Sequence, residues 1–351
     1  VDGLRVTDKA TAEVAEMVAD PAVQAVYVAS PHQFHVEHVR LAAAAGRHIL
    51  VEKPMALRLE DCLEMAGAAR AAGVRLLVGP SHSYDASYLR AREMIRSGAY
   101  GRLRMITAMN FTDYLYRPRR PEELDTARGG GAVFSQAPHQ VEIARLLAGR
   151  PARSVRATAS VWDPARGTEG AYQAFLDFGD GLSASLTYSG HAHFDTDAWM
   201  GWIGETGQQR DPARYGEARA ALRAVRNPAE ETALKERRTY GRTATAAEAR
   251  RAPPPAAHEH FGIFIASLDG ADLRPTPLGV EVHAHEERRF EALPPVAIPR
   301  ASVLDELQNA VVRGVAPLHD GAWGAATVEI CLAILESAHS GREVALRHQE
   351  S

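Results

Sequence analysis

The chain has 351 residues, a net charge of −4 and 46% hydrophobic residues, enough for a full core and typical of two domains. The weak negative charge and the lack of a long basic run exclude an electrostatic nucleic-acid binder. No stretch approaches about 18 consecutive apolar residues and no secretory segment opens the chain, so we expect no membrane partner and a cytoplasmic protein. Cys62 and Cys331 lie in helical apolar patterns and are expected to be reduced core residues.

The first eighty residues repeat a strand–helix unit, the pattern typical of a doubly wound parallel sheet. We expect strands over residues 4–6, 24–29, 48–51 and 74–78, and helices over residues 11–19, 35–45 and 59–72. The second of these strands is an unbroken apolar run, which indicates a parallel strand covered on both faces.

The usual glycine signature of a dinucleotide domain is missing from this region. Such a domain begins with a strand, a G-x-G-x-x-G turn and a helix, but the chain opens in what reads as the third strand–helix unit. Gly129-Gly130-Gly131 cannot substitute, because no Val/Ile-rich strand leads into it. We therefore expect residues 1–80 to form a partial NAD(P)-binding Rossmann domain, either N-terminally incomplete or without its phosphate cradle.

From residue 81 to 351 the pattern changes to that of an α+β domain with an open, mainly antiparallel sheet. Strands are expected over residues 102–112, 153–162, 171–178, 182–188, 261–267, 280–285 and 288–293, and helices over 85–97, 139–148 and 323–340. Residues 208–260 form a helical insertion, in which Asn227-Pro228 marks a helix start. The insertion is either solvated or a lid or subunit contact. An uncovered sheet face predicts a homo-oligomer, a dimer or tetramer.

Lys53 stands at the carboxyl end of the strand over residues 48–51, within Glu52-Lys53-Pro54. Lysine is rarely buried without a partner, and ligands of open α/β sheets bind beyond the carboxyl ends of the strands. Pro54 lacks a ladder donor and ends the pairing, so the Lys53 ammonium is expected to face a crevice. A surface turn that merely contains a charge is the alternative. His82-Ser83-Tyr84 also follows a strand and is a further candidate to border the site.

Several short motifs occur together in a characteristic order. They are Ala29-Ser30-Pro31 with His35, Glu52-Lys53-Pro54, Gly129-Gly130-Gly131 followed by His139, and the run Asp305-Glu306-Leu307, Gly314, Pro317, Asp320-Gly321 and Ser337. Together they resemble the Gfo/Idh/MocA family of NAD(P)-dependent oxidoreductases. Within that family, residues 130–136 with 139–140, 186–190 with 193–195, 201–205 and 317–324 most resemble phthalate 4,5-cis-dihydrodiol dehydrogenases.

The resemblance implies two catalytic residues, Lys53 beside the nicotinamide and the reacting hydroxyl, and His139 facing the substrate from the second domain. It implies NAD or NADP as cofactor, lined by Ser30, Pro31, His32, His35, Glu52, Lys53 and Pro54. Sugar and inositol dehydrogenases of the family carry Asp four residues before the histidine, where this chain has Ser135. Because a hydroxyl cannot act as the carboxylate partner, the full triad does not transfer.

Oxidation of a diol carbon needs a hydride acceptor and a base for the hydroxyl proton. Lys53 is either that base or a donor that stabilises alkoxide charge, with His139 as the alternative base. Desolvation and a cationic nicotinamide would depress the lysine pKa, and Glu52 would oppose them. A cis-dihydrodiol regains an aromatic ring after loss of hydride and tautomerisation, a pull that would tolerate Ser135 in place of Asp.

The aromatic and arginine-rich loop over residues 113–128 is the expected substrate clamp. Arg117, Arg119 and Arg120, beside Tyr114 and Tyr116, would bind the carboxylates of a phthalate-derived substrate. Ser135 and His139 complete the predicted substrate-binding residues. The alternative is a solvated basic loop balanced by its own acidic residues. His191, His193, Asp195 and Asp197 have a spacing that could suit a metal, but we interpret them as a polar strand end and predict no metal.

The sequence thus predicts an NAD(P)-dependent dehydrogenase that oxidises a cis-dihydrodiol of phthalate or a related aromatic carboxylate to a catechol-type diol. A sugar or polyol dehydrogenase of the same family is one alternative, against which Ser135 and the Arg/Tyr loop argue. A catalytically silent binding or sensor protein is the other, prompted by the absent glycine turn.

Overall fold

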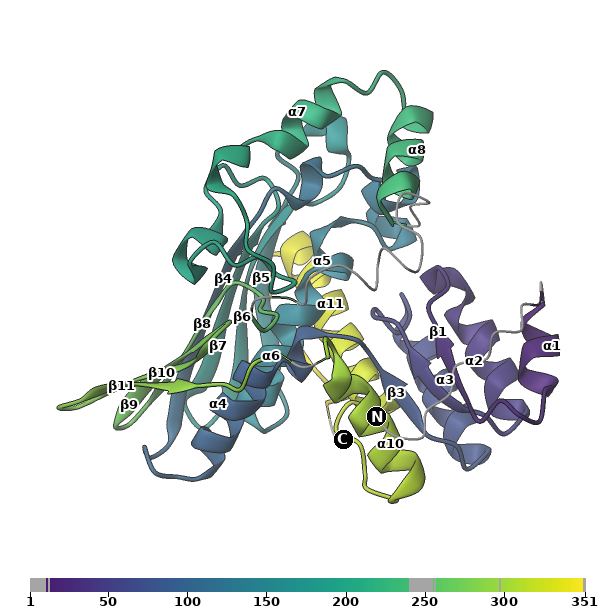
Figure 1. Cartoon of the computed structure of the whole chain (residues 1–351), viewed down its shortest axis with the longest axis horizontal. Helices are drawn as coiled ribbons and strands as arrows, with labels where there is room; N and C mark the ends of the chain where they lie inside the picture. Colours follow the sequence, from purple (N-terminus) through teal and green to yellow (C-terminus); the bar gives the residue numbers. More distant parts are fainter. Residues whose placement is uncertain (1–10, 12, 240–254, 256, 297, 350–351) are drawn as a thin grey trace.

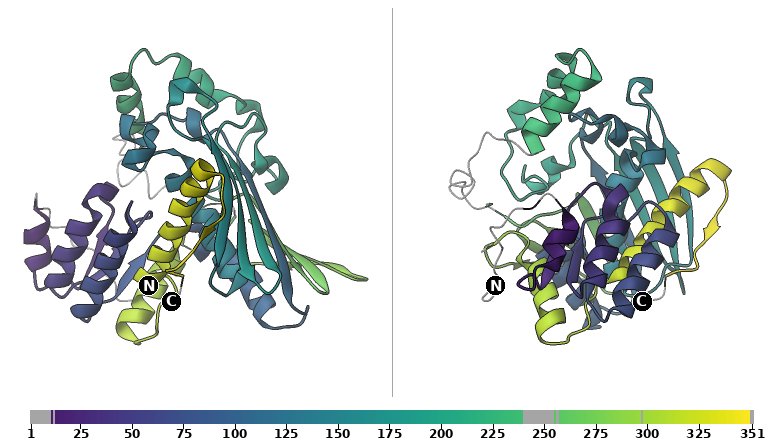
Figure 2. Two further views of the ribbon diagram at one scale, coloured as in Figure 1. Left: turned by 180° about the vertical axis from the view of Figure 1, so that it is seen from behind. Right: turned by 90° about the vertical axis from the view of Figure 1, so that its right-hand side faces the viewer.

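The computed structural model describes residues 11, 13–239, 255, 257–296 and 298–349, and these form two β-sheets that share a set of helices (Figure 1). Figure 2 shows that the smaller and the larger sheet lie on either side of the C-terminal helix α11 (Gly321–Ser340). The fold is α/β, a parallel sheet followed by a mainly antiparallel one, as predicted. The strand expected over residues 4–6 lies outside the described residues.

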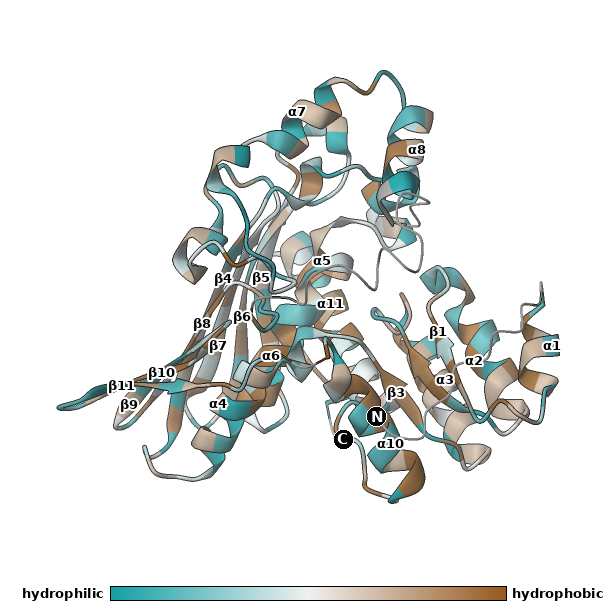
Figure 3. Ribbon diagram, in the orientation of Figure 1, coloured by the Kyte–Doolittle hydropathy of each residue, from teal (hydrophilic) through white to brown (hydrophobic). Residues whose placement is uncertain are grey.

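The smaller sheet consists of three parallel strands in the order β1-β2-β3. They are β1 (Ala25–Val28), β2 (His48–Val51) and β3 (Leu76–Val78), and they alternate with α1 (Val14–Ala19), α2 (His35–Ala44) and α3 (Leu59–Ala71). Ile49 and Val51 are fully buried, because helices cover both faces of a parallel sheet. Figure 3 shows the hydrophobic colouring along β3.

Two helices from the end of the chain complete the layers of this first domain. α10 (Ala301–Val312) packs Val303 and Leu307 against Leu50 and Leu77, while α11 adds residues to the core formed with α2 and α3. The sequence pattern predicts α11 but not α10. The N-cap position of α10 is Arg300 in the left-handed conformation, without a side-chain cap, so the usual start signal is absent.

The larger sheet has nine strands in the order β11-β10-β9-β8-β4-β7-β6-β5-β12. They are β4 (Leu103–Phe111), β5 (Ser154–Ser160), β6 (Ala171–Gly179), β7 (Leu182–Ser189), β8 (Ile263–Leu268), β9 (Ala271–Thr276), β10 (Gly279–Ala284), β11 (Arg288–Ala292) and β12 (Val344–Ala345). The pair β4 and β7 is parallel and the other pairs are antiparallel. The pattern missed β9, whose Pro275 argues against a strand by sequence.

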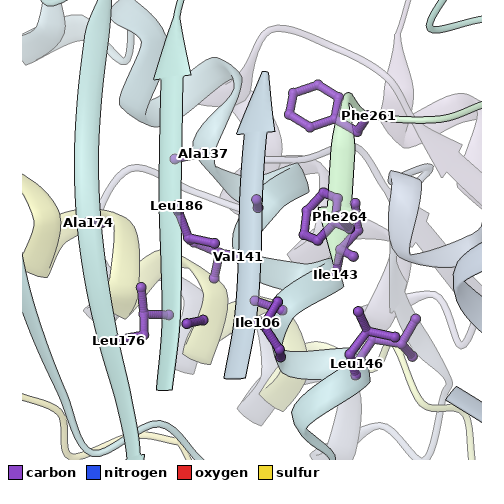
Figure 4. Close-up of a cluster of buried hydrophobic side chains, with 14 of the residues drawn as sticks. Ile106, Ala137, Val141, Ile143, Leu146, Ala174, Leu176, Leu186, Phe261 and Phe264 are labelled. Atoms are coloured by element: carbon purple, nitrogen blue, oxygen red, sulfur yellow. The ribbon is translucent and has the colours of Figure 1, made fainter. Parts of the chain in front are cut away.

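One face of the larger sheet is covered by α4 (Ala86–Arg96), α5 (Gly131–Ser135), α6 (Ala137–Ala148) and α11. Figure 4 shows Ile106, Leu176 and Leu186 from the strands beside Val141 of α6. α11 is long and apolar enough to cross a membrane by length and composition, but 67% of its apolar window is buried in the protein. Its composition therefore fits its place between the two sheets.

The other face of the larger sheet carries partly exposed apolar side chains. Met105 on β4 and Phe175 on β6 are 48% and 51% exposed, although they lie mid-strand. Residues 194–200 reach one end of this face, where the rings of Phe111 and Phe194 lie 6.5 Å apart and Arg274 donates to the Trp199 backbone oxygen.

The insertion contains α7 (Glu217–Arg223) and α8 (Pro228–Thr239). Asn227 caps α8, since its Oδ1 accepts the backbone N–H of Glu230 at 3.0 Å, and the predicted helix start is confirmed. Glu231 of α8 pairs with Arg166 at 2.8 Å and Lys235 pairs with Glu123 at 3.1 Å. α8 is therefore docked on the loop that holds the aromatic and arginine residues, and is not a solvated appendage.

Candidate active site

The turns that follow β1, β2 and β3 meet at one edge of the parallel sheet, where they face α5 and α6 of the second domain (Figure 1). Lys53, after β2, reaches across this junction: its Nζ donates a hydrogen bond to the backbone oxygen of Ser135 at 3.0 Å. Burial lowers the pKa of Lys53, and the negative charges of Glu52, Glu205 and Glu142 oppose that shift. The amine is thus held at the domain junction as a group easier to deprotonate than a free lysine.

His139 lies in the first turn of α6 and is 6% exposed. Its Nδ1 is 3.3 Å from the Ser81 hydroxyl and 3.5 Å from the backbone nitrogen of His82. Because a backbone N–H can only donate, Nδ1 is the acceptor and the ring proton belongs on Nε2. Burial lowers the pKa of His139 well below its ordinary value, and the positive charges of Lys53 and His82 lower it further, so the imidazole is neutral.

His82, in the short helix η2 (His82–Tyr84) after β3, is clamped between two carboxylates. Its Nδ1 is 2.7 Å from Asp85 and its Nε2 is 3.3 Å from Glu205. Burial disfavours the charged ring, but both carboxylates outweigh that effect and raise the pKa of His82 to about 10. The ring packs edge-on against His139, with 4.7 Å between centroids. A cationic imidazole therefore stands directly beside the neutral one.

Glu205 enters the site from the turn after η7 (Thr196–Met200). Burial would raise its pKa, but the hydrogen bond from His82 and the positive charges of His82, Arg117 and Lys53 lower it to about 2. The bond to His82 uses Oε1, and Oε2 hydrogen-bonds to no residue in the part of the chain described. The side chain is 31% exposed. Glu205 is thus an ionised carboxylate with one oxygen left open.

A buried network of polar side chains holds η2 in place. The Ser83 hydroxyl donates to Glu142 at 3.0 Å and lies 2.8 Å from Nε2 of His319. His319 in turn meets Glu306 through Nδ1 at 2.9 Å. The Ser–His–Glu order has the geometry of a nucleophilic triad, but Ser83 and His319 are both fully buried, so no substrate can reach the hydroxyl. The network instead ties η2 to α6 and α10.

The residues predicted to line a cofactor divide into two groups. His35 is 1% exposed, and its two ring nitrogens contact the backbone oxygens of Ser30 and Met55 at 2.9 and 3.0 Å. It therefore braces the turns after β1 and β2 from inside, and the expectation that it contacts the cofactor is not supported. His32 reaches the backbone oxygen of Arg128 at 2.8 Å and so contacts the second domain. Ser30, Pro31, Glu52, Lys53 and Pro54 remain at the strand ends.

Ser30, Glu52 and Lys53 place a hydroxyl, a carboxylate and an ammonium group at the carboxyl ends of the parallel strands, where ligands of open α/β sheets bind. Glu52 accepts a hydrogen bond from Tyr27, and Ser30 pairs with His38 at 2.9 Å. None of the described strands of the parallel sheet leads into a glycine-rich turn, so these strand ends supply no glycine cradle for a pyrophosphate. Gly129-Gly130-Gly131 does not serve as one either: a Cβ on Gly129 would lie 2.6 Å from the His32 ring. Gly129 therefore allows the two domains to approach closely, whereas Gly130 and Gly131 make room for Glu122, Glu123 and Glu169 within the second domain.

In the aromatic and arginine-rich loop, two of the three arginines are engaged internally. Arg119 is 7% exposed, lies 3.6 Å over the Tyr114 ring, and donates to the Tyr114 backbone oxygen at 2.7 Å. Arg120 pairs with Glu122 at 3.2 Å. The expectation that Arg119, Arg120 and Tyr114 bind substrate is therefore not supported, because their partners lie within the loop. Tyr116 is covered by Arg219, 4.1 Å from its ring.

Arg117 is the arginine that points toward the site. Its Nε donates to Asp113 at 2.9 Å, and it is 40% exposed. Burial lowers its pKa, but Glu205 and Asp113 outweigh this effect and raise it. Its terminal nitrogens hydrogen-bond to none of the described residues. It can therefore offer two parallel donors to a carboxylate.

The structure gives another explanation for the four residues after β7 whose spacing could suit a metal, His191, His193, Asp195 and Asp197. Asp195 and Asp197 both pair with Arg210. His191 stacks on Trp162, with 4.8 Å between ring centroids, while His193 is exposed. These side chains do not converge on a common point.

Two sequence profiles match the chain, one in each domain. One is described as an oxidoreductase family with an NAD-binding Rossmann fold and matches residues 4–80, and the other is the GFO/IDH/MocA C-terminal domain and matches residues 88–210. The 1-carboxy-3-chloro-3,4-dihydroxycyclohexa-1,5-diene dehydrogenase of Comamonas testosteroni is 44% identical over 325 residues, which is 92% of this chain and 81% of that protein. The chain belongs to the GFO/IDH/MocA oxidoreductase family.

Solved structures agree with this GFO/IDH/MocA assignment. A dehydrogenase structure from Bordetella bronchiseptica is similar with a TM-score of 0.87 and 39% identity, over 96% of this chain and 86% of that one. The WlbA dehydrogenase from Bordetella pertussis, solved with NADH and UDP-GlcNAcA, is similar with a TM-score of 0.62 and 22% identity, over 95% and 82% of the chains. The latter likeness concerns the fold. As a GFO/IDH/MocA member the protein is an NAD(P)-dependent oxidoreductase.

The sequence analysis did not predict Glu205 as a site residue, and it named His82 only as a candidate to border the site. The rule that singles out Lys53, the carboxyl end of a parallel strand, applies equally to Ser81 and His82 after β3. Glu205 comes from the turn after η7, which only the folded chain brings to the site. Its one local signal is an acidic residue between Gly204 and Gly207 in an apolar context.

The lowered pKa of Lys53 can be measured without any enzyme assay. The chain has three lysines, Lys9, Lys53 and Lys235, so reductive methylation with ¹³C-formaldehyde should give few signals, and Lys53→Arg identifies the one of interest. We expect Lys53 to titrate below its ordinary pKa, and Glu205→Gln to lower that pKa further because a neighbouring negative charge is removed. A Lys53 signal that titrates like free lysine would show that the amine is not desolvated.

Proposed function

We propose that this protein oxidises a carboxylated cyclohexadiene cis-diol to a catechol-type carboxylate, with NAD or NADP as hydride acceptor. The contact between Lys53 and the backbone of Ser135, beside the neutral His139, carries the proposal, because it assembles an amine and an imidazole at the strand ends. The similar protein from Comamonas testosteroni is named for a carboxylated dihydroxycyclohexadiene substrate. In this proposal residues 1–80 bind the cofactor and residues 81–351 bind the substrate.

The chain's own groups divide the proton chemistry between them. The nicotinamide cofactor supplies the hydride acceptor. Lys53, as the free amine, takes the proton of the reacting hydroxyl on Nζ while the carbinol carbon becomes a carbonyl. His139 cannot take that proton on Nδ1, which already accepts hydrogen bonds, and instead offers Nε2–H to the substrate oxygen. The resulting ketone tautomerises to the aromatic diol, which pulls the reaction forward.

Substitution of either group tests this division. Lys53→Met and His139→Ala are each expected to lower turnover of 3,4-dihydroxycyclohexa-1,5-diene-1-carboxylate by roughly a hundredfold or more, followed by NADH absorbance. In the unsubstituted protein kcat/KM should rise with pH as Lys53 loses its proton, at a lower pH than for a free lysine because burial lowers its pKa.

Lys235→Met is the matched control, since this lysine pairs with Glu123 on the loop surface. Its turnover should stay within about threefold of the unsubstituted protein, as is usual away from the reacting atoms. Near-normal rates in both site variants would end the proposal.

The substrate carboxylate is assigned to Arg117 rather than to Arg119 or Arg120. We expect Arg117→Gln to raise KM for the carboxylated diol by about 10- to 100-fold with little change in kcat, because a bidentate ion pair that forms on binding is lost. The same diol without its carboxylate serves as the control substrate, and its KM should not respond. An equal KM change for both substrates would place the carboxylate elsewhere.

We further propose that the uncovered face of the larger sheet is a contact between copies of the chain, working in the cytoplasm. The half-exposed Met105 and Phe175 support this assembly, and the two unpaired, buried cysteines support a reducing compartment.

Light scattering on a sizing column tests the proposed assembly. The protein should elute as a dimer or tetramer, and Phe175→Asp should shift it toward the monomer mass because a charge would be buried in the contact. Tyr215→Asp, at a 72% exposed aromatic of the insertion, is the control and should leave the mass unchanged. A monomeric unsubstituted protein would refute the assembly.

A further inference from the structure

Glu205 is a carboxylate that the proton chemistry above does not use. It lies 3.3 Å from His82, and His82 packs against His139 with 4.7 Å between the ring centroids. Its charge also acts on Lys53. The carboxylate is therefore separated from His139 by a single side chain, that of His82.

Only one of the two carboxylate oxygens of Glu205 accepts a hydrogen bond from the described residues. Oε1 accepts from His82, whereas Oε2 accepts from nothing in the described part of the protein, and the side chain is 31% exposed. An ionised carboxylate is an acceptor with room for about four hydrogen bonds, and charge-assisted bonds to hydroxyls are among the stronger ones. The open oxygen thus suits a hydroxyl donor from a ligand.

A vicinal diol has a second hydroxyl that does not react. Lys53 and His139 engage the reacting oxygen, and the adjacent carbon places its own hydroxyl next to them. We propose that Glu205 accepts a hydrogen bond from this second hydroxyl, and so selects a diol over a simple alcohol. The inference rests on the proposed function, which it deepens by assigning a residue to the second oxygen.

The surrounding charges explain why this acceptor stays ionised and in place. His82 holds Oε1 and is itself anchored by Asp85 at 2.7 Å. Arg117 and Lys53 add positive charge around the carboxylate. A site built to hydrogen-bond a hydroxyl discriminates strongly against an analogue that lacks it, because the carboxylate must then lose water without a replacement.

The decisive experiment compares two substrates, the carboxylated diol and its analogue with hydrogen in place of the second hydroxyl. The unsubstituted protein should prefer the diol in kcat/KM by about 30-fold or more. Glu205→Ala should reduce that preference to about threefold or less, and Glu205→Gln, which keeps a neutral acceptor, should retain an intermediate preference.

Asp85→Asn is the matched control, because it removes the other carboxylate from the same imidazole and leaves Glu205 in place. It should change kcat/KM for both substrates by the same factor and keep the preference. If Glu205→Ala also lowers kcat/KM for both substrates by the same factor, Glu205 contributes only its charge to the site and the inference is wrong.

Binding of the catechol product gives a second readout without turnover. Calorimetric titration should show weaker binding of the catechol carboxylate to Glu205→Ala and Glu205→Gln than to the unsubstituted protein, with less change for the corresponding monophenol. An unsubstituted protein that oxidises neither substrate contradicts the proposed function itself. One that oxidises both equally well contradicts only the role of Glu205.

Discussion

Charge compensation between the two domains is the constraint on which the site depends. Four charged side chains, Lys53, His82, Glu205 and Asp85, share a largely enclosed region, and each has an opposite charge or a backbone dipole as partner. Removal of one partner from such a buried pair typically costs about 3–5 kcal/mol, because the remaining charge is left without compensation. The domains are held together at this point by Lys53, which comes from residues 1–80, while Ser135, His82 and Glu205 come from residues 81–351.

The same constraint explains how the site works with Ser135 at the position where relatives of the sugar and inositol type carry aspartate. The serine contributes its backbone oxygen to Lys53, so the side chain is not needed for that contact. Among the described residues His139 has no carboxylate partner, and its Nδ1 instead accepts from Ser81 and from the backbone of His82. In the proposed mechanism a histidine held in this tautomer donates to the substrate, and the amine of Lys53 is the group that accepts the proton.

The sequence predicts the features of this site that follow from local rules. Lys53 was found because a charge at the carboxyl end of a buried parallel strand is unusual, and the start of α8 was found from Asn227-Pro228. The sequence could not show which of the loop arginines faces the site, because Arg117, Arg119 and Arg120 have the same chemistry and neighbouring positions. Only the packing of Tyr114 and Glu123 reveals that Arg119 turns into the loop, and α10 escaped notice because Arg300 gives no start signal.

Glu205 could not be predicted because its role depends on tertiary neighbours, His82, Arg117 and Lys53, that are distant in the sequence. An acidic residue in a glycine-rich turn is ordinarily solvated, and its position between Gly204 and Gly207 does not show which side chains it meets in the fold. What makes it a site residue is that His82, Arg117 and Lys53 arrive from three other segments and keep it ionised. The positive charges of His82, Arg117 and Lys53 act on this carboxylate, and among the described residues its Oε2 has no hydrogen-bond partner. A ligand that completes this arrangement must therefore bring a donor, as the second hydroxyl of a diol does.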